Sequence, residues 1–210
     1  MIFIRYENWK SYLRYYPVTS LLLLANIVMF IIVSLDGGST NLYTLVKYGA
    51  VVDVGPEKEE AWRYLASVFL HNGFNHLFFN SFSLLVFAPP LERLLGWWRY
   101  AILYLGGGIL ANVLFIALGT PAPNTATVSV GASGAIYAVY GAFMYIALLQ
   151  RAMMDESSRK TLYGLLVIGI ITSFAAAKVN WLAHLGGLAA GFFLYGLIIR
   201  IFKSSRRQGR

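Results

Sequence analysis

The sequence has no cysteine and few charged residues, and both shortages restrict what the protein can be. Without cysteine, the 210-residue chain has no disulfide, no thiolate metal ligand and no cysteine nucleophile. Charged residues make up 12% of the chain, whereas soluble domains typically carry about 25%. Hydrophobic residues make up 58% of it, and the mean hydropathy is +0.63. This composition is typical of a chain that lies in a lipid bilayer.

Long apolar segments give the expected fold class. A helix that spans a bilayer needs about 20 mostly apolar residues. Six segments approach this pattern: Val18–Leu35, Phe74–Leu91, Tyr100–Leu118, Ala132–Leu149, Leu162–Ala177 and Trp181–Phe202. The second and fourth contain polar residues and are weaker on hydropathy alone. We therefore expect an all-α membrane protein, a polytopic bundle of six transmembrane helices.

The basic residues indicate the orientation of this bundle, because Lys and Arg favour the cytoplasmic side. With six spans, both termini lie on one side. Thirteen basic residues fall there: Arg5, Lys10, Arg14, Arg93, Arg99, Arg151, Arg159, Lys160, Arg200, Lys203, Arg206, Arg207 and Arg210. The other side has four: Lys47, Lys58, Arg63 and Lys178. Both termini are therefore expected in the cytoplasm, and the net charge of +8 requires no nucleic-acid partner.

The membrane domain is expected to cover residues 18–202, between two shorter cytoplasmic parts. Residues 1–17 mix apolar and aromatic side chains with three basic ones, which predicts an amphipathic arm along the inner membrane surface. Residues 203–210 form a basic tail. The longest connection, residues 36–73, lies on the outer side and holds an acidic cluster of Glu57, Glu59 and Glu60. A loop of this length is often functional.

Polar side chains within spans are costly, which makes them candidates for function. His76 and Asn80 lie four residues apart in the second span, on one helical face, and both can donate hydrogen bonds. Taken alone, the pair fits contacts that bridge helices equally well.

The fourth span begins with Gly131-Ala132-Ser133-Gly134, after the helix-breaking segment Thr120–Thr125. Ser133 is then expected at a helix N-terminus, where unpaired N–H groups and the helix dipole favour a developing anion. On its own, the motif would also fit a small-residue packing patch.

In the sixth span His184 is accompanied by a small-residue stripe, and such stripes let helices approach closely. The stripe is Ala183, Gly187 and Gly191, and the fourth span offers Gly134, Ala138 and Ala142. Close packing of the two spans would bring Ser133 within hydrogen-bond reach of His184. Tyr137, one turn after Ser133, would then stack on the His184 ring, although an ordinary core aromatic is the simpler explanation.

A serine activated by a histidine is the minimum apparatus for acyl transfer. No span contains a carboxylate for a third member, and Glu92 lies at the cytoplasmic edge, so a dyad is expected rather than a triad. The chain lacks the HExxH motif of a zinc protease and the paired intramembrane Asp residues of an aspartyl protease. No metal or cofactor is expected.

Taken in order, these residues resemble the rhomboid family from about residue 49 to residue 191. The motifs are Trp62-Arg63, Phe69-Leu70-His71, His76 with Asn80, Leu91-Glu92 with Gly96, Gly131–Gly134, Tyr137, and Ala183–Gly187 with Gly191. One departure is Ala88-Pro89-Pro90, where the family commonly has glycine. It is expected to shift the cytoplasmic end of the second helix.

The resemblance implies Ser133 as nucleophile and His184 as general base. It implies oxyanion donors from the Ser133 backbone N–H and from the His76 and Asn80 side chains. The supporting residues would be Tyr137, Gly131, Gly134, Gly187 and Gly191, with Trp62-Arg63 in a structural loop partly embedded in the outer leaflet. The site would open to water on the outer side, and the fifth helix would act as a lateral gate.

The expected function is therefore that of an intramembrane serine endopeptidase of the bacterial cell membrane, in the basic six-helix form, acting on transmembrane segments of other proteins. A catalytically inactive rhomboid-like protein that binds membrane clients is the alternative. A transporter would require inverted repeats and interrupted helices, which the sequence does not show.

Overall fold

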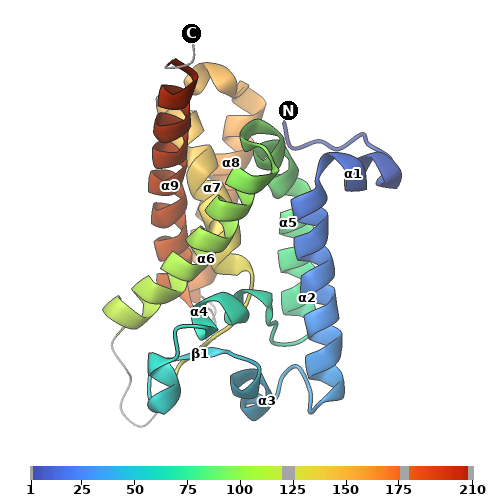
Figure 1. Cartoon of the computed structure of the whole chain (residues 1–210), viewed down its shortest axis with the longest axis vertical. Helices are drawn as coiled ribbons and strands as arrows, with labels where there is room; N and C mark the ends of the chain where they lie inside the picture. Colours follow the sequence, from blue (N-terminus) through green and yellow to red (C-terminus); the bar gives the residue numbers. More distant parts are fainter. Residues whose placement is uncertain (1, 120–125, 176–179, 208–210) are drawn as a thin grey trace.

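Long helices dominate the computed structural model, which describes residues 2–119, 126–175 and 180–207 (Figure 1). Within these ranges six helices have 17 to 27 residues: α2 (Pro17–Leu35), α5 (Phe74–Leu95), α6 (Trp97–Leu118), α7 (Ser133–Leu149), α8 (Glu156–Ala175) and α9 (Trp181–Arg207). Among the described helices, α2, α6 and the Trp181–Phe202 part of α9 are long and apolar enough to cross a membrane. The chain is a multi-pass membrane protein.

Each expected span falls on one of these helices, but several ends differ. α6 begins at Trp97, α8 at Glu156, and α9 continues to Arg207, so the 202/203 boundary is not a helix end. The segment Thr120–Thr125, the end of the expected fifth span (176–177) and the last tail residues (208–210) lie outside the described residues.

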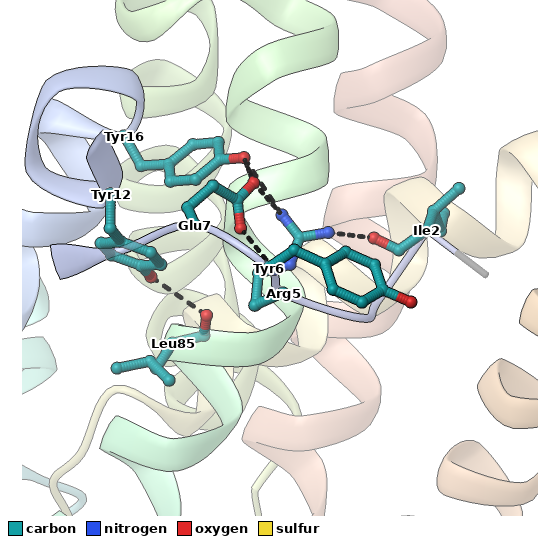
Figure 2. A network of polar contacts seen from close by, with 7 residues as sticks. All are labelled: Ile2, Arg5, Tyr6, Glu7, Tyr12, Tyr16 and Leu85. Atoms are coloured by element: carbon teal, nitrogen blue, oxygen red, sulfur yellow. Dashed lines mark hydrogen bonds and ion pairs between the residues drawn. The ribbon is translucent and has the colours of Figure 1, made fainter.

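α5 runs through Pro89 and Pro90 to Leu95, four residues beyond the expected end. Proline has no N–H, so Pro89 cannot donate to the carbonyl of Leu85. The Tyr12 hydroxyl, from the short helix α1 (Trp9–Tyr15), donates to that carbonyl instead, at 3.0 Å (Figure 2). A contact from the N-terminal arm therefore satisfies the acceptor that the proline leaves.

The N-terminal arm differs from an arm that only rests on the membrane surface. Phe3 is buried, and its ring packs edge-on against Phe87 of α5 and Phe143 of α7, with centroids 5.0 and 5.2 Å apart. The Ile2 backbone N–H donates to Ser158 Oγ in the first turn of α8, at 2.9 Å. The arm thus ties α5, α7 and α8 together at one end of the bundle.

A polar network fixes this arm in place (Figure 2). The Tyr16 hydroxyl donates to Glu7 Oε1 at 2.6 Å and accepts from Arg5 at 3.2 Å. Arg5 also donates to the Ile2 carbonyl. The hydrogen bond from Tyr16, with Arg5 nearby, holds the pKa of the Glu7 carboxyl below its ordinary value.

The connection of residues 36–73, named the outer connection after the side on which the sequence predicts it, is folded rather than irregular. It contains α3 (Leu42–Lys47), β1 (Val51–Val52), the 3₁₀ turns η1 (Pro56–Glu59) and η2 (Ser67–Phe69), and α4 (Arg63–Ala66). β1 pairs antiparallel with β2 (Val128–Ser129), which lies just before α7. A third 3₁₀ turn, η3 (Arg151–Met153), precedes α8. In Figure 1, α3, α4 and β1 lie at the opposite end of the bundle from α1 and the end of α9.

α7 is buried along most of its length and packs directly on α9. The contact depends on glycine. A Cβ at Gly187 would collide with the carbonyl oxygen of Gly134, and a Cβ at Gly191 with that of Ala138. The small-residue stripes therefore bring the two backbones together, as the sequence predicts.

Candidate active site

Ser133 is the first residue of α7, and the preceding loop holds it in place. Gly131 has φ +121°, a conformation that favours glycine, and its N–H donates to the Ser67 carbonyl at 2.9 Å. The first N–H groups of a helix have no partner within the helix. Ser133 therefore lies where the backbone can donate to a negatively charged atom.

His184 lies in the first turn of α9, which Asn180 caps. Asn180 Oδ1 accepts from the Ala183 N–H at 3.0 Å, and the Asn180 carbonyl accepts from the His184 N–H at 3.2 Å. His184 Nε2 lies 2.9 Å from Ser133 Oγ. The close α7–α9 contact thus places the two side chains, 51 residues apart in sequence, at hydrogen-bond distance.

Tyr137 packs flat against the His184 ring. The centroids are 4.2 Å apart and the planes differ by 10°. Because Tyr137 lies four residues after Ser133 on the same helix, its ring forms a wall that limits rotation of the imidazole.

His76 and Asn80 of α5 approach the loop just before Ser133. The Asn72 N–H donates to His76 Nδ1 at 3.3 Å, which places the proton of a neutral His76 on Nε2. A Cβ built on Gly131 would lie 2.8 Å from His76 Nε2 and 3.5 Å from Asn80 Nδ2. Among the described residues, Asn80 Nδ2 has no hydrogen-bond partner. Two nitrogen donors therefore converge beside Gly131, and a side chain at this position would collide with the His76 ring.

These residues line one cavity of about 720 Å³. Its walls come from α5, α6, α7, the start of α9, the second half of α8, and β2 with the loop that follows it. Gly131 and Gly134 belong to the lining. No cluster of three or more His, Asp or Glu side chains that could hold a metal ion occurs within the described ranges.

Three sets of residues that the sequence singled out lie outside this cavity. Gly187 and Gly191 belong to the α7–α9 contact described above. Trp62 and Arg63 hold the outer connection together: Arg63 is buried, stacks 4.8 Å from the Trp62 ring, and donates to Glu60 and to the Ala50 carbonyl. Glu92 lies at the far end of α5, where it accepts hydrogen bonds from the first turn of α2.

Two polar residues near the dyad were not predicted from the sequence. Asn112 of α6 donates to the Tyr64 carbonyl and to Ser67 Oγ, both at 2.9 Å, and accepts from Ser129 at 3.4 Å. It thereby joins the outer connection to β2. Ser173 of α8 lies 2.6 Å from His184 Nδ1. Both residues fall in expected spans, so the rule that polar residues in spans are candidates for function would have found them.

Comparison with known proteins shows the family of the chain. The family model for the rhomboid domain matches residues 58–201. The chain is 36% identical to YdcA of Bacillus subtilis over 209 residues, 98% of this chain and 100% of YdcA. It is 35% identical to the rhomboid protease GluP of the same organism over 175 residues, 83% of this chain and 33% of GluP. It is 30% identical to rhomboid-type serine protease 2 of Emericella nidulans over 155 residues, 72% of this chain and 30% of that protein. The chain belongs to the rhomboid family of serine proteases.

Proposed function

We propose that the protein is an intramembrane serine endopeptidase that cleaves transmembrane segments of other membrane proteins. Ser133 is the nucleophile and His184 is the general base. The observation that carries this proposal is the 2.9 Å contact between Ser133 Oγ and His184 Nε2. It occurs at the start of a helix and beside a cavity large enough for part of a peptide.

In the acylation step, Ser133 Oγ attacks the scissile carbonyl while His184 Nε2 takes the hydroxyl proton. The carbonyl oxygen becomes an oxyanion in the tetrahedral intermediate. Donors that are already in place stabilise that charge without reorganisation. The backbone N–H of Ser133, His76 Nε2 and Asn80 Nδ2 are suited to this role because the two side chains converge next to Gly131.

The intermediate collapses when His184 returns the proton to the leaving amine, and the amine-side product departs. A water molecule then attacks the acyl-enzyme while His184 accepts its proton. The bond to Ser133 Oγ breaks, His184 returns the proton to that oxygen, and the carboxylic acid product departs. The starts of α5, α7 and α9 lie at the same end as the outer connection (Figure 1), so water would enter from that side.

We also propose six membrane spans with both termini in the cytoplasm of a bacterial cell. α1 and the end of α9 lie at one end of the bundle, which fits an even number of spans (Figure 1). This end carries most of the basic residues, as the positive-inside rule requires. The arm, residues 1–17, and the basic tail, residues 203–210, would then be cytoplasmic.

The substrate is a transmembrane segment that can unwind, since a helical peptide bond keeps its carbonyl in a hydrogen bond. Substrates are expected to carry Gly or Pro near the outer membrane face, where these residues weaken the helix. α8, which forms one wall of the cavity, would be the lateral gate that admits them.

The test is cleavage by purified protein in liposomes of a transmembrane substrate with a Gly–Pro pair near its outer end. Ser133→Ala should abolish cleavage and labelling by a fluorophosphonate probe, while the melting temperature stays near that of wild type, because only one oxygen is removed. Ser20→Ala, which removes a serine hydroxyl from α2 far from the cavity, is the matched control and should cleave normally. Cleavage by Ser133→Ala at the wild-type rate would refute the assignment. A wild-type protein that binds such substrates without cutting them would favour the client-binding alternative.

A further inference from the structure

We propose that Ser173 of α8 is a positioning residue for the dyad: its hydroxyl holds His184 in the tautomer that can accept the Ser133 proton. This inference rests on the proposed function. Ser173 Oγ lies 2.6 Å from His184 Nδ1, on the side of the ring opposite Ser133, and the side chain is 4% exposed.

The direction of this hydrogen bond follows from counting protons. A serine hydroxyl has one proton and two lone pairs. Ser173 Oγ also lies 2.6 Å from the Gly169 carbonyl, which can only accept. If Ser173 gave its proton to His184, Ser173 Oγ and the Gly169 carbonyl oxygen would lie 2.6 Å apart with no proton between them. Ser173 therefore donates to Gly169 and accepts from His184 Nδ1–H.

The Tyr137 hydroxyl completes the arrangement. It lies 3.3 Å from Ser173 Oγ and donates to it, because the serine proton is already used. All three hydrogen-bonding positions of the Ser173 hydroxyl are then occupied by a carbonyl, an imidazole N–H and a phenol. A buried hydroxyl with every position filled is held in one orientation, and so is the ring that donates to it.

This orientation selects the reactive tautomer. A neutral imidazole carries one proton, so a proton fixed on Nδ1 leaves Nε2 with a lone pair. Nε2 is the atom that faces Ser133 Oγ at 2.9 Å. Ser173 thus supplies the acceptor that orients His184. In a catalytic triad a carboxylate has this role, and the expected spans contain none. Since a neutral hydroxyl stabilises an imidazolium less than a carboxylate does, we expect a smaller effect than in a charged triad.

The contact also makes the dyad depend on a third helix. Ser133 and His184 belong to α7 and α9, which pack backbone to backbone, whereas Ser173 belongs to α8. An α8 seated against the dyad is therefore part of the arrangement that keeps the histidine ready to act as a base.

The direct test is to measure which ring nitrogen of His184 carries the proton. The chain has three histidines, His71, His76 and His184, so ¹⁵N-histidine labelling gives few signals, and His184→Gln assigns the one of interest. In wild type at neutral pH, His184 should carry its proton on Nδ1. In Ser173→Ala, the form with the proton on Nε2 should become substantially populated. A wild-type His184 with the proton on Nε2, or an unchanged tautomer in Ser173→Ala, would overturn the inference.

Turnover gives the second readout. Ser173→Ala should lower kcat and the rate of fluorophosphonate labelling by about tenfold, equivalent to about 1.4 kcal/mol, with little change in KM. Ser20→Ala again serves as control, since Ser20 also donates to the carbonyl four residues earlier in its helix. Turnover of Ser173→Ala within twofold of wild type, or a loss explained by a raised KM or a lower melting temperature, contradicts the inference.

The two proposals fail separately. If Ser133→Ala still cleaves, the proposed function is wrong. If Ser133→Ala is inactive while Ser173→Ala keeps the wild-type tautomer and rate, only the role of Ser173 is wrong.

Discussion

Replacing Glu92 by glutamine tests how the end of the bundle where α5 meets α2 is held together. Glu92 is 2% exposed and lies near the end of α5. Its carboxylate accepts from the Val18 and Thr19 N–H groups, both at 2.9 Å, and from Thr19 Oγ1 at 2.6 Å. The N-cap residue of α2, Tyr16, makes no side-chain cap. Glu92 therefore caps α2 from a neighbouring helix, where a negative charge also complements the helix dipole.

The magnitude follows from these contacts. A glutamine side chain has one acceptor oxygen instead of two, so in either orientation at least one backbone N–H faces an NH₂ group. An unsatisfied buried donor costs about 1–3 kcal/mol, and loss of the charge at the helix start costs about 0.3–1 kcal/mol. We expect the free energy of unfolding to fall by about 2–3 kcal/mol. In a chain of this size that corresponds to a melting temperature lower by about 4–12 °C.

The assay is thermal unfolding in detergent micelles, followed by circular dichroism. Glu156→Gln is the matched control, because Glu156 forms an exposed ion pair with Lys160, with side chains 70% and 77% exposed. Exposed pairs contribute little, and the charge that Glu156 places at the start of α8 is exposed as well, so its loss costs only about 0.3 kcal/mol. This variant should therefore melt within about 1–2 °C of wild type. Turnover of folded Glu92→Gln at low temperature should be normal, since the cavity lies at the other end. A melting temperature for Glu92→Gln equal to that of the control would show that the capping argument is wrong.

Three further predictions test other parts of the molecule. His76→Ala and Asn80→Ala should each lower turnover on the order of ten- to a hundredfold with a small change in KM; mutants that melt early but turn over normally while folded would instead indicate a packing role. Phe3→Ala should destabilise the protein by about 3 kcal/mol in the same melting assay. If the arm lay only on the membrane surface, this substitution would leave the stability unchanged. In this cysteine-free chain, a cysteine at Ser39 should react with an impermeant thiol reagent in intact cells while one at Ser11 should not, and the reverse pattern would exclude cytoplasmic termini.

The positions of the long helices could be predicted closely because they depend on local composition. Runs of apolar side chains mark a helix wherever it packs, and all six expected segments fall on helices of the structure. Their ends were less predictable. α5 passes through Pro89 and Pro90, and the Leu85 carbonyl, which loses its helical donor at Pro89, accepts from Tyr12, 73 residues away in sequence.

The outer connection and the N-terminal arm also depend on contacts between residues that are remote in sequence, so their structure could not be predicted. Strand β1 has two residues, too few for any periodicity to reveal, and it exists because β2 pairs with it. Phe3 looks like any membrane-surface aromatic in sequence. It is buried only because Phe87 and Phe143, on different helices, leave a slot that its ring fills.

For the candidate site, the sequence by itself determined which side chains are available: one serine at a helix start, one histidine beside a small-residue stripe, and a histidine and an amide on one helical face. Residue type and spacing suffice for that, because they fix chemistry and helical face. Only the tertiary structure decided distance and direction. It places Ser133 Oγ 2.9 Å from His184 Nε2, aims His76 and Asn80 at Gly131, and sets Ser173 against His184 Nδ1. These relations arise between helices, where packing of side chains that are remote in sequence sets the geometry, and no pattern within one helix contains them.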